Sequence, residues 1–397
     1  MKFNQFLCAL SCLLLFITAA KAATLELWFE KYEAKPVFDD LAIKFQQETG
    51  INLKSQHMPT GDLKAAIIQG VSEDKGPDIV FAPSDFIGNH ALLKLSEVDQ
   101  VELTKGIKPE AMASVTEKGS VYGVPLLFGN HLLLYYNKRF VESPATTWQE
   151  LLSQRKDIEG KGTNLISWKP MEMYWLIPFL TAFDGRPVDG DKVTLNTPEF
   201  KKGLAFYREQ VDAGLINMRC SYECVYDHFL QGQYAYTING DWAYRAMKAS
   251  LGDDFGVAVL PSVEGRDMTP MTSSIALMFP GNSLGGEANK QINMFVQFML
   301  RPENLIHLHE MSGMMPSQSE TYDELEQKYS ADPNMQAFFQ QMKHTIPMPP
   351  TPQMSAAWIG MAKGVSVYMR KKASLDDSGK LMQVHAEREL ARQLRAE

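Results

Sequence analysis

The chain has 397 residues, of which 45% are hydrophobic, 22% charged and 10% aromatic. This is the composition of an ordinary globular protein, and it excludes collagen-like, low-complexity and wholly disordered chains. The 39 basic and 47 acidic residues give a net charge of -8, which argues against binding to the phosphate backbone of a nucleic acid. At about 150 residues per domain, the length predicts two or three domains.

The first 22 residues have the pattern of a secretory signal peptide. Lys2 supplies a positive charge, and the apolar stretch from Phe6 to Ile17 is too short to span a membrane comfortably. The small residues Ala20 and Ala22 predict cleavage before Ala23. An uncleaved membrane anchor is the alternative, which the well-formed cleavage site disfavours. The sequence therefore predicts an exported protein.

Strands and helices alternate in the first third of the exported chain. The expected elements are a strand at Leu25 to Phe29, a helix at Val37 to Thr49 closed by Gly50, a strand at Ile51 to His57, a helix at Asp62 to Val71 and a strand at Pro77 to Phe81. Alternation of this kind predicts a parallel sheet covered by helices on both faces.

The same α/β pattern starts again in the middle of the chain. The expected helices are Trp148 to Ile158, Tyr174 to Phe183 and Pro198 to Ala213, and the expected strands are Asn164 to Trp168, Tyr234 to Ile238, Phe255 to Leu260 and Ser274 to Phe279. Thr197 and Pro198 are typical of a helix start. From Glu287 onward the chain is mostly helical and ends in an amphipathic helix near 379–395. Two α/β lobes joined by extended segments fit this order.

Two cysteines, Cys220 and Cys224, lie beyond the signal peptide. In an oxidising compartment an isolated close pair is most simply a local disulfide, and its short loop predicts only modest stabilisation. Zinc is the poorer alternative, because no second cysteine or histidine pair stands at ligand spacing. The sequence thus predicts neither a metal site nor a cofactor.

Several segments match a known protein family in order and spacing. They are Phe45 to Gly50, Gly76 to Phe81, Tyr122 to Pro125, Tyr136 to Lys138, Phe229 to Trp242, Gly256 to Pro261 and Pro352 to Trp358. On these segments the chain resembles the periplasmic sugar-binding proteins of ABC importers, and in particular the maltose/maltodextrin-binding family. The resemblance runs through essentially the whole exported chain.

This resemblance implies an α/β, two-lobed periplasmic binding protein fold with discontinuous lobes and a hinge. We expect lobe one to comprise residues 23–127 plus 275–315, and lobe two 128–274 plus 316–397. The resemblance also implies a periplasmic monomer, without enzymatic activity, that clamps its ligand between the lobes. The partners it implies are a maltodextrin-type oligosaccharide and a membrane permease with its ATPase. Closure around the ligand would change the surface shown to the permease.

A neutral oligosaccharide offers apolar faces and rims of hydroxyls, so it calls for aromatic platforms with nearby carboxylates. The resemblance places stacking rings at Tyr174, Trp242 and Trp358, and a hydroxyl-binding carboxylate at Glu172. The alternatives are that both tryptophans belong to the core and that Glu172 only favours a helix N-terminus. The loop position of Trp242 and the family register around Tyr174 favour the binding site.

The remaining candidate ligand residues come from both expected lobes. Asp85 matches a ligand-binding aspartate and follows a strand end, where such folds place ligands. Met348 matches another binding position, with core filler as the alternative. Where the chain departs from the family pattern, the expected substitutes in the wall of the site are Tyr32, Glu33, Phe86 and Asn130. These departures leave the sugar, its length and its linkage open.

Three other functions fit the sequence less well. A secreted glycosidase needs two carboxylates across the scissile bond, and the candidates Glu33, Asp85 and Glu172 show no such pairing in sequence. A polyamine, metal chelate or anion could occupy the same fold, and acids with aromatics would suit a polyamine. A structural protein without a ligand does not explain the candidate stacking residues.

Overall fold

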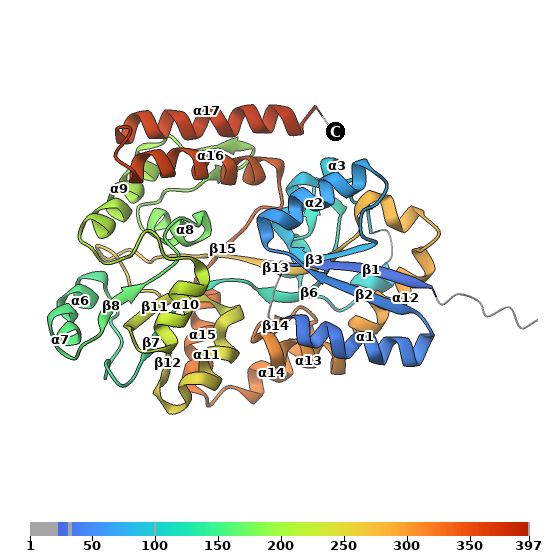
Figure 1. Cartoon of the computed structure of the whole chain (residues 1–397), viewed down its shortest axis with the longest axis horizontal. Helices are drawn as coiled ribbons and strands as arrows, with labels where there is room; N and C mark the ends of the chain where they lie inside the picture. The colour runs from blue at the N-terminus through green and yellow to red at the C-terminus, as the bar shows by residue number, and fades with distance from the viewer. Residues whose placement is uncertain (1–22, 31–33, 99–100, 396–397) are drawn as a thin grey trace, which may run out of the picture.

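The computed structural model describes residues 23–30, 34–98 and 101–395 (Figure 1). The predicted signal peptide and the candidate ligand residues Tyr32 and Glu33 lie outside these ranges. Two lobes lie side by side, one around a seven-stranded sheet and the other around a four-stranded sheet. Among the described helices, none combines the length and apolar character needed to cross a membrane.

The seven-stranded sheet forms lobe one, with the strand order β14-β6-β13-β3-β1-β2 and β15 beside β13. Its strands are β1 (Thr24–Phe29), β2 (Asn52–His57), β3 (Ile79–Pro83), β6 (Val124–Gly129), β13 (Met271–Met278), β14 (Met315–Pro316) and β15 (Ile346–Pro347). β1 pairs in parallel with both β2 and β3, as the alternation predicts, whereas β13 runs antiparallel between β3 and β6. All residues of β3, β6 and β13 are buried, because helices cover both faces of the sheet.

Helices of lobe one follow and cover these strands. They are α1 (Lys35–Thr49), α2 (Thr60–Ser72), the 3-10 helix η2 (Ser84–Asn89), α3 (His90–Leu93), α4 (Val101–Thr104), α5 (Pro109–Ala113), the 3-10 helix η5 (Pro280–Gly285), α12 (Asn289–Met299) and α13 (Pro302–Ser312), with the small β4 (Thr116–Glu117) and β5 (Ser120–Val121) hairpin between them. α1 ends at the predicted Gly50, whose φ of 73° forms a left-handed C-cap.

The four-stranded sheet of lobe two has the order β12-β7-β11-β8. Its strands are β7 (Leu132–Asn137), β8 (Asn164–Ser167), β11 (Tyr234–Gly240) and β12 (Phe255–Ala258), and β9 (Val188–Asp189) pairs with β10 (Lys192–Val193) apart from it. The surrounding helices are α6 (Trp148–Ser153), α7 (Arg155–Gly160), α8 (Met173–Thr181), α9 (Pro198–Asp212), α10 (Tyr222–Leu230), η3 (Asp241–Ala243), α11 (Tyr244–Leu251), η4 (Gly252–Asp254), α14 (Ser319–Lys328), α15 (Pro333–Lys343), α16 (Pro352–Met369) and α17 (Leu375–Gln393). Thr197 caps α9 as predicted, because its side chain accepts a hydrogen bond from the backbone N–H of Phe200. Cys220 and Cys224 form the predicted disulfide at the start of α10.

Two of the differences between predicted and observed elements have a clear structural cause. The helix predicted from Trp148 to Ile158 is divided into α6 and α7 at Gln154, whose backbone N–H bonds to both Glu150 and Leu151 in a tightened last turn. The strand predicted from Ser274 begins earlier, at Met271, because β15 pairs with its first two residues. Neither the tightened turn nor the short partner strand has a clear sequence signal.

The chain passes between the two sheets more than once. The first crossing joins β6 to β7 through Gly129 and Asn130, whose φ values are 131° and 47°. A Cβ atom on Gly129 would lie 2.5 Å from a carboxylate oxygen of Asp241, so this turn requires glycine. The second crossing joins β12 to β13, and a third follows β14. The fold is therefore two-lobed and the lobes are discontinuous in sequence.

Candidate ligand-binding site

Three predicted stacking residues from separate elements lie together at the junction of the lobes. Tyr174 is on α8, Trp242 on η3 and Trp358 on α16. The Tyr174 ring centroid lies 6.3 Å from that of Trp242 and 6.2 Å from that of Trp358, with the ring planes tilted by 49° and 48°. Tyr174 thus stands between the two tryptophans and contacts both. We call these three residues the aromatic cluster.

The hydroxyl of Tyr174 ties α8 to both crossing segments. Its single hydrogen is shared between the backbone carbonyl oxygens of Asn130 and Met271, the latter 3.0 Å from the hydroxyl oxygen. Burial raises the pKa of Tyr174 well above its ordinary value, and the charges of Asp241 and Asp85 raise it further. The hydroxyl therefore keeps its proton and acts as a donor.

Trp242 is built into lobe two. Its side chain is only 7% exposed, and its indole N–H donates to the hydroxyl of Tyr222 on α10 at 3.0 Å. The Trp175 ring meets it edge to face at 5.8 Å, and the Trp175 indole N–H bonds to the carbonyl oxygen of Ile238 in β11. These contacts fix the Trp242 ring, so any platform role would be that of a rigid surface.

Trp358 differs from Trp242 in its hydrogen bonding. Its side chain is partly exposed, and its buried indole nitrogen has no hydrogen-bond partner among the described residues. The preceding turn of α16 is fixed, because Thr351 caps the helix and the Ser355 hydroxyl donates to Asn89 of η2 at 2.7 Å. A buried N–H without a partner costs free energy that a ligand acceptor would recover.

Asp85 lies in the first turn of η2, directly after β3, as its predicted role requires. It is partly buried, and its charge acts on both Tyr174 and Lys64. Lys64, on α2, places its ammonium 4.5 Å from the centre of the Phe86 ring. Burial lowers the pKa of Lys64, and the negative charge of Asp85 opposes this shift. Phe86 itself is fully buried, so in this conformation its ring contacts the Lys64 ammonium and is not exposed to solvent.

The lobes approach each other closely between η2 and α16. A Cβ atom on Gly88 would lie 2.4 Å from the backbone oxygen of Thr351, so only glycine permits this contact. As a result, Asp85 in lobe one and Trp358 on α16 belong to elements that touch. The candidate site therefore takes side chains from both sides of the junction.

Glu172 and Met348 have contrasting environments. Glu172 precedes α8 at its N-cap position without capping it, and one of its oxygens lies 3.2 Å from the ammonium of Lys169. The Glu172 side chain is 46% exposed, so it remains able to accept bonds from a ligand. Met348 is buried, and its backbone N–H bonds to Thr272 of β13. The roles of both residues remain predictions.

A buried contact between a histidine and a carboxyl group lies next to the first crossing. Nδ1 of His131, at the start of β7, is 3.2 Å from a carboxylate oxygen of Asp241, and neither side chain is exposed. Asn130 precedes this pair, and its amide donates to the Ser273 hydroxyl at 2.9 Å. At this crossing, the Asn130 side chain is therefore held through its nitrogen, while its oxygen has no hydrogen-bond partner among the described residues.

Two surface cavities lie elsewhere on lobe two. One, of about 180 Å³, is lined by residues that include Arg155, Asn164 and Tyr234, and the other, of about 200 Å³, by residues that include Thr181 and Arg266. Neither is lined by a predicted ligand residue. At the junction of the lobes, the Tyr174 ring packs against the rings of Trp242 and Trp358.

Lys64 and Tyr222 are contacts of the candidate site that sequence reasoning missed. Lys64 follows the buried Leu63 in an amphipathic helix, where a lysine usually marks the solvent face. Tyr222 stands between the two cysteines and has no feature that predicts its bond to Trp242. Both depend on residues about 20 positions away in sequence, so no local pattern could have found them.

Comparison with known proteins gives one family and several distant relatives. A family model described as bacterial extracellular solute-binding protein matches residues 40–337. A maltooligosaccharide ABC transporter solute-binding lipoprotein of Streptococcus pneumoniae is 24% identical over 347 residues, covering 82% of this chain and 79% of the relative. A maltodextrin-binding protein of Bacillus subtilis is 21% identical over 348 residues, covering 82% of this chain and 80% of the relative.

Another relative has a different ligand in its name. An sn-glycerol-3-phosphate-binding periplasmic protein of Yersinia pseudotuberculosis is 23% identical over 245 residues, covering 55% of this chain and 54% of the relative. All three relatives are solute-binding proteins by name. The family model spans most of the chain, and the structure has the two discontinuous lobes that the resemblance implies. The protein therefore belongs to the bacterial extracellular solute-binding protein family.

Proposed function

We propose that this protein is the substrate-binding component of an ABC importer and that it captures maltodextrin-type oligosaccharides between its lobes. The observation that carries this proposal is the aromatic cluster, together with the indole N–H of Trp358, which has no hydrogen-bond partner among the described residues. Aromatic faces suit the apolar faces of sugar rings, and an indole N–H suits a sugar hydroxyl. Asp85 and Glu172 add carboxylates that accept hydroxyl hydrogen bonds. The relatives that are named for maltooligosaccharide and maltodextrin support the same ligand class.

Ligand entry requires the aromatic cluster to separate. A sugar ring between two aromatic faces needs roughly 8 Å, because each contact takes about 4 Å. The Tyr174 and Trp358 centroids are only 6.2 Å apart. We infer that the lobes separate by bending at the crossings and then close on the sugar. The moving lobes would be those that the resemblance implies, residues 23–127 plus 275–315 and residues 128–274 plus 316–397. Such a protein would act as a periplasmic monomer that presents its closed form to a permease and ATPase.

A phosphorylated polyol is the second candidate. Lys64 lies beside Asp85 and could meet a phosphate, and one relative is named for sn-glycerol-3-phosphate. A cationic polyamine is less compatible, because the charge of Lys64 already offsets that of Asp85. Catalysis finds no support in the family, whose relatives are named as binding proteins.

Thermal unfolding and tryptophan fluorescence with a ligand panel test the proposal. A maltodextrin should raise the melting temperature, since a ligand that binds only the folded state stabilises it. It should also shift tryptophan emission, because Trp242 and Trp358 lie in the cluster. A response to glycerol phosphate or to a polyamine, with none to malto-, cyclo- or other oligosaccharides, would overturn it. Release of shorter sugars during incubation would indicate a glycosidase instead.

A further inference from the structure

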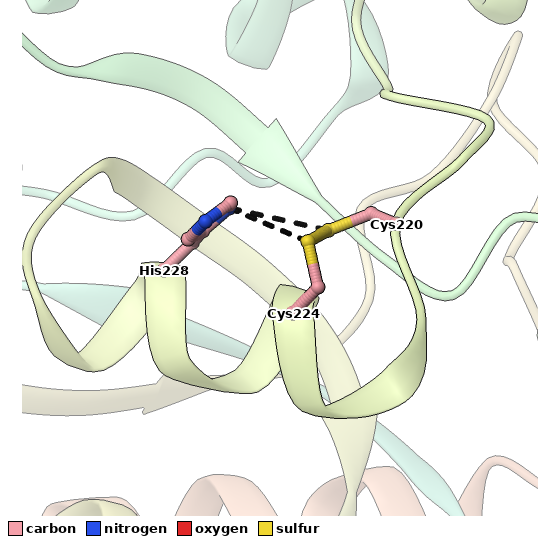
Figure 2. Close-up of side chains that lie close together, drawn as sticks. All are labelled: Cys220, Cys224 and His228. Atoms are coloured by element: carbon pink, nitrogen blue, oxygen red, sulfur yellow. Dashed lines mark hydrogen bonds between the residues drawn. A yellow bond between two sulfur atoms is a disulfide. The ribbon is translucent and has the colours of Figure 1, made fainter.

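A histidine faces both sulfurs of the disulfide in lobe two. Nδ1 of His228 lies 3.9 Å from the sulfur of Cys220 and 3.7 Å from that of Cys224, as the dashed lines in Figure 2 show. The atoms of these three side chains that could bind a metal ion all lie within 4.8 Å of one another. A search of the sequence for a second cysteine or histidine pair does not find this group, because a single histidine, His228, completes it.

The local structure fixes these three groups on one side of α10. Cys224 is in the first turn and His228 one turn later, so both project from the same face of the helix. Cys220 reaches them from the preceding loop, where its backbone N–H bonds to the carbonyl oxygen of Asn217. The His228 ring stacks on Tyr234 with centroids 6.3 Å apart and planes 24° apart. The imidazole is thereby oriented toward the sulfurs.

We propose that the Cys220–Cys224 disulfide is the oxidised state of a redox-linked zinc site that His228 completes. In a tetrahedral site with Zn–S near 2.3 Å and Zn–N near 2.0 Å, a sulfur and a nitrogen ligand lie about 3.5 Å apart. The two measured S···N distances are within 0.4 Å of that value. To bind zinc, the two sulfurs must separate to about 3.8 Å from each other. Two thiolates and an imidazole, with water as the fourth ligand, are donors that zinc prefers.

The chemistry has two balanced steps. A dithiol reductant gives two electrons and two protons to the disulfide, which becomes two thiols while the dithiol becomes a disulfide. A zinc ion then binds the two sulfurs and Nδ1 of His228, and the two thiol protons leave to solvent. The N-terminus of α10 favours the thiolate of Cys224, whose backbone N–H is bonded to the Ser221 side chain. Zinc would thus replace the covalent link beside Tyr222, the hydrogen-bond partner of Trp242.

Cobalt spectroscopy and zinc competition on the full chain test this site without any assumption about its sugar. The protein is reduced anaerobically with a phosphine, which takes up the oxygen of one water as the disulfide gains two hydrogens, and the reagent is then removed. Added Co²⁺ should give thiolate charge-transfer bands and tetrahedral d–d bands, and Zn²⁺ should displace it. The oxidised protein, whose sequence is identical, should show neither set of bands.

Variants identify the ligands. In competition with a chromogenic chelator, Cys220→Ser and Cys224→Ser should each weaken zinc binding by more than about 100-fold, and His228→Gln by at least about tenfold, since even groups behind the ligands are worth about 10–100-fold. His344→Gln removes an exposed histidine elsewhere and should bind zinc as the wild type does. Equal melting temperatures of the oxidised wild type and His228→Gln would show that the variant folds. The proposal is wrong if the reduced wild type gives no cobalt–thiolate bands, or if His228→Gln binds zinc as tightly as the wild type.

Discussion

Trp242 and Trp358 look equivalent in sequence, but their indole groups differ in the structure. The Trp242 N–H bonds to Tyr222, whereas the Trp358 N–H has no partner among the described residues. A partnered N–H contributes to folding, and an unpartnered one at a partly exposed ring is available to a ligand. The resemblance gives both tryptophans a stacking role. Their different hydrogen bonds predict a structural contribution from the Trp242 N–H and a binding contribution from the Trp358 N–H.

Replacement of Trp358 by phenylalanine tests this difference at the level of one N–H group. The variant keeps an aromatic ring and loses the donor, so we expect oligosaccharide affinity to fall by about tenfold, equivalent to ~1.4 kcal/mol. The free energy of unfolding should stay within about 0.5 kcal/mol of the wild type, because no protein bond is lost. Calorimetric titration and urea unfolding measure the two quantities.

Trp148→Phe is the matched control. It also removes an indole N–H, but this one donates to Gln210 at 3.0 Å inside lobe two. We expect it to lower the free energy of unfolding by roughly 1–2 kcal/mol and to leave sugar affinity unchanged. If Trp358→Phe behaved like Trp148→Phe, the Trp358 N–H would be serving the fold and not the ligand.

At the residue scale, residue type and register could predict the aromatic residues but not their partners. The resemblance places Tyr174, Trp242 and Trp358 at stacking positions, and the structure brings the three rings together, while their binding role stays a prediction. Lys64 and Tyr222 could not be identified, because their contacts to Phe86 and Trp242 depend on how α2 and α10 pack. Burial also could not be predicted, and the structure buries Phe86 completely.

Among the helices, α8 is tied most directly to the crossings, through the Tyr174 hydroxyl. Tyr174→Phe would leave the Asn130 and Met271 carbonyl oxygens without this donor. We expect the free energy of unfolding in urea to fall by roughly 1–3 kcal/mol. Tyr368→Phe is the control, because its hydroxyl has no hydrogen bond within the described part of the chain, and it should change stability by less than about 0.5 kcal/mol. A Tyr174→Phe variant as stable as this control would argue against the tie.

A second link joins α11 of lobe two to α13 of lobe one. The Arg245 guanidinium donates to Nε2 of His309 at 2.9 Å, and the Tyr329 hydroxyl lies 3.0 Å from the same nitrogen. Because guanidinium can only donate, Nε2 accepts, and Nδ1 carries the proton toward the Met314 carbonyl oxygen. The pKa of His309 is lowered from 6.5 to about 4, chiefly by burial and in addition by the charge of Arg245.

This link predicts a pH dependence of stability. The folded pKa of His309 is below the unfolded value, so its contribution is fully present above pH 6.5 and is lost as the pH falls toward 4. The loss amounts to roughly 3 kcal/mol. In urea unfolding at several pH values, His309→Gln should flatten the slope across this window. His307→Gln, on the same helix but outside the link, should keep the wild-type slope; an unchanged slope in His309→Gln would contradict the assignment.

At the scale of elements, local chemistry predicted the helix ends that have side-chain or glycine signals. Gly50 ends α1 and Thr197 starts α9 as expected, because a left-handed C-cap and a hydroxyl N-cap are local requirements. The break at Gln154 has no local signal, and the side chain at this position accepts a hydrogen bond from the Tyr236 hydroxyl, 82 residues away. The ends of a helix or strand cannot be predicted from local sequence where they depend on residues far away in the chain.

For the whole molecule, the alternating pattern predicts two α/β lobes, and the resemblance predicts that they interleave. The sheet orders confirm both, because β13 lies between β3 and β6 although most of lobe two separates them in sequence. The closed aromatic cluster could not be predicted, since it depends on how the lobes meet. Under the proposed function, its short ring distances predict that sugar binding is coupled to lobe movement.

Isothermal titration of the wild-type protein with maltooligosaccharides, sn-glycerol-3-phosphate and a polyamine tests the central claim most directly. The claim is that a neutral oligosaccharide binds at the aromatic cluster between the lobes. We predict saturable binding of one maltooligosaccharide per chain, with a negative heat-capacity change from burial of apolar surface. The other two ligands should give no saturable heat. Saturable binding of glycerol phosphate or polyamine, with none by any oligosaccharide, would contradict the claim.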